Sequence, residues 1–417
     1  MVVLAAITIN LSLGILYAWS VWVKTLIKVK DAGQIITSGP AAGWTYLTNA
    51  QAATPFSLAV IVFALMMIPG GRMHDRWGPR VGPISGAVFL ALGCILAGLG
   101  KSYGGLLLGV GILGGTGLGL AYAATVPAAL RWFGPRQRGL MGGLVLSGYA
   151  GAALYIPPLA AYLVKAGGLT FSIIFLGLFW AAVVILVGNL LAWPEPGYET
   201  PAPPVKPGGA PVKAMDTGVD WAPGQIFKTW QFYVLIFMFC GAIQAGLTII
   251  AQAAPILAKT GKSFSFLAAH TWILFAFGVL VNIGGKIGTG WYSDIYGRNK
   301  ALSLNCLAGA LCLFSLPVII ASQNLFLLLL AAGIGYWLHE GTLALVPAYA
   351  ADFYGTKNLG MNYVLLSVGG WPLGFLISRL SGHLRDSTGS LVWASIFSAL
   401  MLVSVIFLAR MTRRPAV

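Results

Sequence analysis

The stretch Gly71-Arg-Met-His-Asp-Arg-Trp-Gly-Pro-Arg80 follows a long apolar segment in the first half of the chain. A similar stretch, Gly290-Trp-Tyr-Ser-Asp-Ile-Tyr-Gly-Arg-Asn-Lys300, follows an apolar segment in the second half, and the aspartates Asp75 and Asp294 lie 219 positions apart. A second pair of polar loop motifs repeats at almost the same spacing: Arg131-Trp-Phe-Gly-Pro-Arg-Gln-Arg-Gly139 and Asp352-Phe-Tyr-Gly-Thr-Lys-Asn358, with Phe133 and Phe353 220 positions apart. Two motifs with one period indicate a duplicated unit, and such duplication places a binding site near the membrane midplane between the repeats.

The composition is that of a membrane protein. Of the 417 residues, 58% are hydrophobic and only 8% are charged, whereas about 25% of the residues in a soluble domain are charged. Apolar segments of about 20 residues can span a bilayer as helices. The sequence predicts twelve of them, at 2–23, 50–70, 81–99, 104–129, 140–164, 170–193, 229–257, 267–290, 301–321, 324–350, 359–381 and 388–409. The predicted fold class is therefore an all-α membrane protein with 12 transmembrane helices in two six-helix bundles.

The predicted domains are an N-terminal bundle at 1–193, a polar linker rich in Pro and Gly at 194–228, and a C-terminal bundle at 229–417. Lys and Arg are concentrated in the loops after the even-numbered spans, in the linker and in the C-terminal tail. This distribution predicts that both termini are cytosolic, and we expect a multi-pass protein of a bacterial inner membrane. Because the net charge of +15 comes from these short loops, it does not indicate nucleic-acid binding.

Lys286 lies in an apolar, glycine-rich span, where a charged side chain is costly unless it faces the bundle interior or water. Asn282 lies four residues earlier, on the same face of the predicted helix. We interpret Lys286 as a buried positive charge that binds a carboxylate, with Asn282 as a hydrogen-bonding neighbour. The alternative is a lysine whose long side chain reaches the membrane surface near a helix end.

His339 and Glu340 lie near the middle of the tenth predicted span. Glu340 must be protonated, paired with Lys286 or exposed to water, because an unpaired carboxylate within a membrane is very costly. All three states make Glu340 a candidate proton site, and His339 is a second candidate because histidine is the residue type that commonly exchanges protons near neutral pH. The alternative is a structural hydrogen bond to a neighbouring helix.

Three tyrosines, Tyr17, Tyr122 and Tyr149, lie near the middles of the first, fourth and fifth spans. A tyrosine hydroxyl in hydrocarbon needs a hydrogen-bond partner. We expect the three hydroxyls to bind polar atoms of a substrate while the rings pack against its carbon chain. Ordinary packing between helices is the alternative for each of them.

The loop motifs around Asp75 and Asp294 resemble the Gly-x-x-x-Asp-Arg-x-x-Gly-Arg signature of the major facilitator superfamily. The resemblance extends over the whole chain and implies a transporter in which the signature acts as a cytosolic latch. The latch residues that it implies are Asp75, Arg76, Asp294 and Arg298.

A narrower resemblance concerns carriers of organic anions. Gly14-Ile-Leu-Tyr-Ala-Trp-Ser-Val-Trp22 and Gly148-Tyr149 look like segments of the oxalate:formate antiporter group, and Asn282-Ile-Gly-Gly-Lys286 resembles the Asp-x-x-x-Arg pair of the monocarboxylate transporters. The resemblance implies that Lys286 replaces the substrate-binding arginine, although lysine lacks its bidentate fork. Gly370 lies where the oxalate carrier has a second cation, and a single buried cation favours a monoanion over a dianion.

The predicted function is secondary active transport of a small monocarboxylate such as lactate, pyruvate or acetate, by proton-coupled symport with alternating access. The substrate neutralises Lys286, and a proton on Glu340, on His339 or from Lys286 itself moves with it. The alternatives are an organic-anion exchanger of the oxalate:formate type, a transporter-like sensor, and a drug or sugar carrier.

The sequence has no pattern of metal ligands, nucleotide fingerprint or catalytic triad. We therefore predict no enzyme activity, no cofactor and no metal site. The expected partners are a small organic anion, a proton and membrane lipid, and we expect a functional monomer that does not bind nucleic acid.

Overall fold

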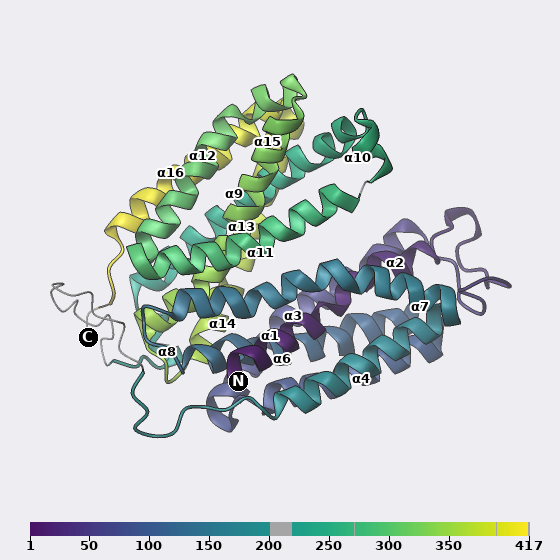
Figure 1. Cartoon of the computed structure of the whole chain (residues 1–417), viewed down its shortest axis with the longest axis horizontal. Helices are drawn as coiled ribbons and strands as arrows, with labels where there is room; N and C mark the ends of the chain where they lie inside the picture. The colour runs from purple at the N-terminus through teal and green to yellow at the C-terminus, as the bar shows by residue number, and fades with distance from the viewer. Residues whose placement is uncertain (201–218, 271, 389, 416–417) are drawn as a thin grey trace. The chain divides into compact units, whose positions relative to one another are not determined.

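The structure is a computed structural model that describes residues 1–200, 219–270, 272–388 and 390–415. The regular secondary structure of these residues is helical (Figure 1). The helices form two compact units. Unit 1 comprises Met1–Trp132 and Gly148–Tyr198, and unit 2 comprises Phe133–Ser147 and Glu199–Val417.

Unit 1 is built around α6, on which α1, α3 and α4 pack. Its elements are α1 (Val2–Leu13), η1 (Gly14–Ala18), α2 (Trp19–Lys24), η2 (Val29–Asp31), α3 (Asn49–Trp77), α4 (Val81–Gly100), α5 (Tyr103–Leu106), η3 (Leu107–Gly114), α6 (Gly115–Leu130) and the greater part of α7 (Arg138–Gly188). Every residue of α6 except Thr116 and Tyr122 is buried, so α6 is the core helix of this unit.

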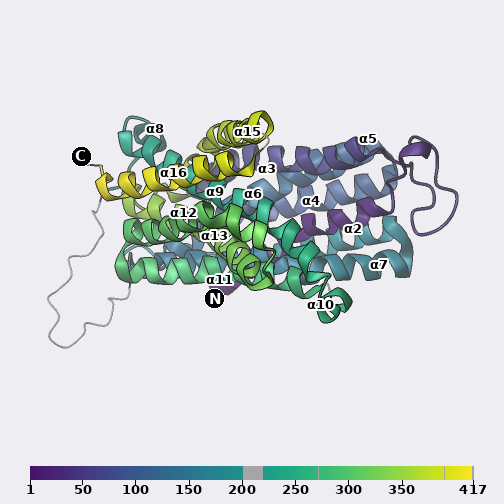
Figure 2. The same cartoon turned by 90° about the horizontal axis from the view of Figure 1, so that it is seen from above.

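Unit 2 is built around α13, on which α9, α11 and α12 pack, and α12 and α16 run side by side in both views (Figures 1 and 2). Besides the first turns of α7, its elements are α8 (Pro223–Ile226), α9 (Trp230–Gly261), α10 (Ser265–Ala269), α11 (Trp272–Tyr296), α12 (Arg298–Ser322), α13 (Leu325–Tyr354), α14 (Leu359–Gly369), α15 (Trp371–Thr388) and α16 (Leu391–Met411).

Within the described residues, ten helices are long and apolar enough to cross a membrane. The predicted spans map onto them with two differences. The fifth and sixth spans share α7, in which Gly168 has φ 84° and ψ 174° and breaks the helix between them. The eleventh span, predicted at 359–381, is divided between α14, which ends at Gly369, and α15. A proline stands at the second position of α15, and proline suits the first turn of a new helix.

Some predicted boundaries were wrong by one or two turns. The eighth span was predicted at 267–290, but Ser265–Ala269 forms the separate helix α10, and the span is α11. Of the predicted linker at 194–228, residues 201–218 lie outside the described ranges, and the short helix α8 lies near its end.

Two of the apolar spans contain segments that depart from α-helical geometry. The first span passes through the 3₁₀ turn η1, which carries Tyr17, between α1 and α2. The fourth passes through the π-helical stretch η3 before α6. Mid-helix segments of these kinds frequently mark functional hinges or sites.

Residues 25–48 form an ordered loop in unit 1, closed by two isolated β-bridges. Trp44 is buried within it, and its Nε1 donates a hydrogen bond to Oγ1 of Thr170 at 3.0 Å. The carbonyl oxygen of Pro40 accepts a hydrogen bond from the backbone N–H of Leu169 at 2.7 Å. The loop therefore packs on the break in α7.

The first turns of α7, which belong to unit 2, lie directly against α11. A Cβ added at Gly143 would overlap the carbonyl oxygen of Lys286, and one added at Gly290 would overlap the carbonyl oxygen of Gly139. Glycines allow two helix backbones to approach this closely. The helix that carries Lys286 is thus held against the start of α7.

Substituting Gly143→Ala should destabilise unit 2 by about 1–3 kcal/mol, because the added methyl meets backbone atoms and forces the helices apart. The midpoint of thermal unfolding in detergent should fall accordingly. Gly104→Ala is the matched control, because a Cβ at Gly104 has open space around it. An equal midpoint in the two variants would contradict the close contact.

Candidate functional site

Lys286, Asn282 and Glu340 form a hydrogen-bonded cluster between α11 and α13. The Nζ atom of Lys286 lies 2.8 Å from Oε2 of Glu340 and 3.3 Å from Oδ1 of Asn282, which accepts its hydrogen bond. Nδ2 of Asn282 donates to Oε1 of Glu340 at 2.5 Å. Asn282 therefore bridges the two members of an ion pair.

The ion pair is buried, with 6% of Lys286 and 9% of Glu340 exposed. Of the three states open to Glu340 from the sequence, the structure has the one in which it is paired with Lys286. The sequence suggested that Lys286 is an unpaired positive charge, but its ammonium group is already paired with the carboxylate of Glu340. The cluster of Lys286 and Glu340 has no net charge when both side chains are ionised.

The sequence explains locally why these side chains meet. Asn282 and Lys286 are one helical turn apart and share a face of α11. At Gly285, α11 approaches α13 so closely that an added Cβ would lie 3.0 Å from the Cα atom of Trp337. This close contact brings Glu340, one turn further along α13, within reach of Lys286.

His339 lies beside the ion pair. Its Nδ1 is 3.2 Å from the carbonyl oxygen of Ile243, and its Nε2 is 3.9 Å from Oε1 of Glu340. A hydrogen bond to the carbonyl requires a proton on Nδ1, so in the neutral ring the unprotonated Nε2 faces the carboxylate. At 3.9 Å the two groups lie beyond hydrogen-bond distance, and they form an ion pair only when the imidazole is protonated on both nitrogens.

A second polar group supports α11 one turn beyond Lys286. Thr289 Oγ1 lies 3.1 Å from the hydroxyl of Tyr292 and accepts a hydrogen bond from Nδ2 of Asn305 at 3.1 Å, and Tyr292 donates to Asn305 Oδ1. These bonds tie α11 to α12. Sequence reasoning missed this group, although Asn305 within an apolar span was the signal that could have pointed to it.

In unit 1 the structure brings Tyr17, Tyr122 and Tyr149 together. The ring centroids of Tyr17 and Tyr149 are 5.6 Å apart, and those of Tyr122 and Tyr149 are 5.9 Å apart. The ring of Phe63 extends this cluster, 5.3 Å from that of Tyr122. All three tyrosines are partly exposed, as a role in binding would require.

The latch motif of the second half is a buried network of charges. The carboxylate of Asp294 accepts hydrogen bonds from the backbone N–H groups of Gly139 and Leu140, at 2.9 and 2.7 Å. These donors lie in the first turn of α7, where they have no partners within their own helix and where a negative charge is favoured. Asp294 also pairs with Arg298 at 2.5 Å. Asp294 thus caps a helix that is distant in sequence.

Asp352 joins this network between two arginines. Its Oδ2 lies 3.0 Å from Nε of Arg298, and its Oδ1 lies 3.3 Å from Nη1 of Arg138. Asp352 and Arg138 were not among the predicted site residues. Their membership in the second pair of repeated loop motifs was the available signal.

The first-half motif is arranged differently. Asp75 pairs with Arg131 at 3.2 Å, and the guanidinium of Arg131 lies 4.6 Å from the ring centroid of Trp193. Arg76, predicted together with Asp75, is exposed. The structure therefore places Asp75 in an ion pair of unit 1 and Arg76 on its surface.

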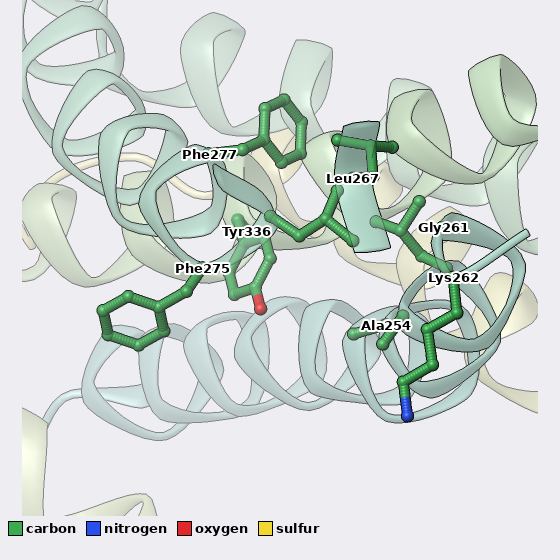
Figure 3. A pocket seen from close by; sticks show the side chains of 10 residues that line it. Ala254, Gly261, Lys262, Leu267, Phe275, Phe277 and Tyr336 are labelled. Atoms are coloured by element: carbon green, nitrogen blue, oxygen red, sulfur yellow. The ribbon is translucent and has the colours of Figure 1, made fainter. Parts of the chain in front are cut away.

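Unit 2 also contains an apolar cavity of about 280 Å³, bounded by α9, α10, α11 and α13 (Figure 3). Its lining includes Phe275, Phe277 and Tyr336, with Lys262 among the residues around it. Lys286, Asn282 and Glu340 do not line this cavity. The polar cluster and the apolar cavity are separate features of the described part of this unit.

Comparisons with known proteins agree on one family. The family described as Major Facilitator Superfamily matches residues 2–346. The chain is 28% identical to the oxalate:formate antiporter of Oxalobacter formigenes, over 78% of this chain and 76% of that protein. It is 26% identical to human monocarboxylate transporter 11, over 84% of this chain and 72% of that protein.

Among solved structures, the fold is similar to that of the transporter FucP in its outward conformation. The TM-score is 0.63 with 17% identity, and all of both chains is covered. A structure of XylE gives a TM-score of 0.64 with 14% identity, covering 97% of this chain and 94% of that one. These two likenesses concern the fold alone.

Proposed function

Because this chain belongs to the Major Facilitator Superfamily of membrane transporters, we propose that it carries a small organic monoanion together with a proton. The substrate class is that of lactate, pyruvate and acetate, and the mechanism is symport with alternating access. The observation that carries this proposal is the buried ion pair of Lys286 and Glu340, bridged by Asn282.

The ion pair supports symport through its charge balance. A carrier whose empty site is cationic must close apolar walls over an unpaired charge, which is very costly in a membrane. Here Glu340 neutralises Lys286 when no substrate is bound. The empty carrier can therefore switch its site from one side of the membrane to the other. Net symport requires this switch of the empty carrier, whereas obligatory exchange does not.

Substrate binding would replace one carboxylate by another at Lys286. The substrate carboxylate takes the place of Glu340 beside Nζ of Lys286. The amide of Asn282 then forms a hydrogen bond either to the substrate carboxylate or to the carboxyl group of Glu340. Glu340, released from its cation but still buried, then takes up a proton, because an unpaired buried carboxylate is strongly disfavoured. In this proposal His339, whose Nε2 lies 3.9 Å from Oε1 of Glu340, delivers that proton. The loaded site is again neutral.

The remaining predicted residues take supporting roles in this proposal. Tyr17, Tyr122 and Tyr149 bind the substrate's polar atoms and carbon chain, and their clustering in unit 1 supports a shared role. The motifs containing Asp75, Arg76, Asp294 and Arg298 act as latches on the cytosolic side. We further propose a monomeric protein of a bacterial inner membrane, with both termini cytosolic.

Exchange of organic anions is the second candidate, and the likeness to an oxalate:formate antiporter favours it. A dianion such as oxalate carries two negative charges, and Lys286 supplies only one positive charge to balance them. Even after Glu340 has taken up its proton, the loaded site would keep one net negative charge, which is costly within a membrane. The site therefore favours a monoanion over oxalate.

The test is uptake of labelled L-lactate by purified protein in liposomes, with and without acid outside. We expect accumulation above equilibrium only when the pH gradient is imposed. Uptake that occurs only into vesicles preloaded with lactate, formate or oxalate would instead establish an exchanger.

Glu340→Gln should convert net uptake into exchange. The neutral amide leaves Lys286 unpaired in the empty carrier, so the empty carrier no longer returns, while the loaded one still does. We expect net lactate uptake driven by the pH gradient to fall at least about tenfold, with uptake into lactate-preloaded vesicles retained. Equal losses in both assays would contradict this role for Glu340.

A further inference from the structure

A basic pocket lies at one end of unit 2, where the turn between α11 and α12, the end of α13 and the tail after α16 meet. Its volume is about 290 Å³. Its lining includes Arg298, Lys300, Asp352, Arg413 and Arg414. Of these described residues, four are basic and one is acidic, so the pocket has a positive net charge.

The acidic residue neutralises at most one of these four positive charges, that of Arg298. Asp352 is already shared by Arg298 and Arg138. Lys300 and Arg413 are exposed side chains on two different elements that border the same pocket. The tail is held in place beside them, because Nδ2 of Asn299 donates to the carbonyl oxygen of Thr412 at 2.9 Å. The arrangement suits a compact anion with several acceptor oxygens.

We propose that this pocket binds the phosphate headgroup of an anionic phospholipid. The lipid source follows from its position, because α11, α12, α13 and α16 are all apolar enough to span a membrane and all have an end here. Tyr296 lines the pocket, and Ile295 and Met411 directly precede lining residues in the chain; these three side chains expose between 57% and 69% of their surface. Large apolar and aromatic side chains of this kind border headgroups at a membrane interface.

The loop motifs that form the pocket are those predicted to lie on the cytosolic side, where the surface of a membrane that contains anionic lipid attracts clustered Lys and Arg. A bound headgroup would lie beside the ion pair of Arg298 and Asp352, which line the same pocket. Lipid binding should therefore stabilise this end of unit 2 and the charged network that Asp294 shares with it.

The test compares retention of phosphatidylglycerol by native mass spectrometry after purification in detergent containing equal phosphatidylglycerol and phosphatidylcholine. Lys300→Gln/Arg413→Gln should lower the affinity for phosphatidylglycerol about 30-fold, which corresponds to about 1 kcal/mol for each charge removed. Lys259→Gln/Arg410→Gln is the matched control, because it removes two exposed charges that do not line the pocket. It should retain the lipid.

The midpoint of thermal unfolding gives a second readout. Phosphatidylglycerol, but not phosphatidylcholine, should raise the midpoint of the parent and of the control variant, and should leave that of Lys300→Gln/Arg413→Gln unchanged. Equal lipid retention by both double variants would overturn the proposal. An equal rise with inorganic phosphate at the same concentration would overturn the assignment to a lipid. Loss of lactate uptake alone, with lipid retention intact, would count against the proposed function and not against this site.

Discussion

Lys286→Ala should reduce lactate uptake to the level of empty vesicles, a loss of at least about 100-fold. The substitution removes the cation that we propose as the partner of the substrate carboxylate. Losing one member of a buried charge pair in a binding site costs roughly 3 kcal/mol or more. The measurement is the initial rate of uptake into proteoliposomes driven by a pH gradient.

Loss of folding must be separated from loss of binding in this variant. Lys286→Ala leaves the buried carboxylate of Glu340 without its cation, so the single variant should also unfold more easily. Lys286→Ala/Glu340→Gln removes both charges and should recover the thermal midpoint without recovering uptake. Lys259→Ala, at an exposed position of α9, should behave as the parent. Normal uptake by Lys286→Ala would remove the basis of the proposed function.

Asp352→Asn should lower the free energy of unfolding by about 3–5 kcal/mol. The asparagine keeps the size of the side chain but leaves the buried guanidinium groups of Arg298 and Arg138 without the carboxylate that they share. Breaking a buried ion pair by removing one partner has costs of this size. Titration with a denaturing detergent, followed by tryptophan fluorescence, gives the difference between the variant and the parent.

Asp31→Asn is the matched control for this substitution. Asp31 also pairs with a cation, Lys28, at 2.5 Å, but both side chains are substantially exposed. Solvent screens such a pair, so its loss should leave the unfolding transition unchanged. If the two variants unfold alike, the network around Asp352 does not hold unit 2 together.

The transmembrane spans could be predicted because each depends on a local run of apolar residues. A backbone in hydrocarbon must satisfy its own hydrogen bonds, so such a run becomes a helix whatever its neighbours are. The errors arose where backbone geometry ends a helix without a change in hydropathy. The separation of α10 from α11 and the division of the 359–381 segment into α14 and α15 are of this kind.

The sequence predicted the residues of the candidate site but not which of them pair with one another. A lysine and an asparagine four residues apart identified the face of α11 that matters, because helical periodicity is a local property. The sequence did not determine the partner of Lys286. Glu340 could avoid the cost of a buried, unpaired carboxylate in three ways: by protonation, by pairing with Lys286 or by exposure to water. The choice depends on the close approach of α11 and α13 at Gly285, which sets the distance between their side chains.

By itself, the sequence determined a membrane protein with a duplicated organisation, and it predicted twelve spans with Lys286 as a candidate buried cation in the eighth. Hydropathy, repetition and charge placement are each properties of short segments, which is why they can be read without a structure. Only the tertiary structure decided that Glu340 neutralises that cation and that Asp352 joins Arg138 to Arg298. These partners are 54 to 214 positions apart in the chain, and they meet only because of how the helices pack and rotate against one another.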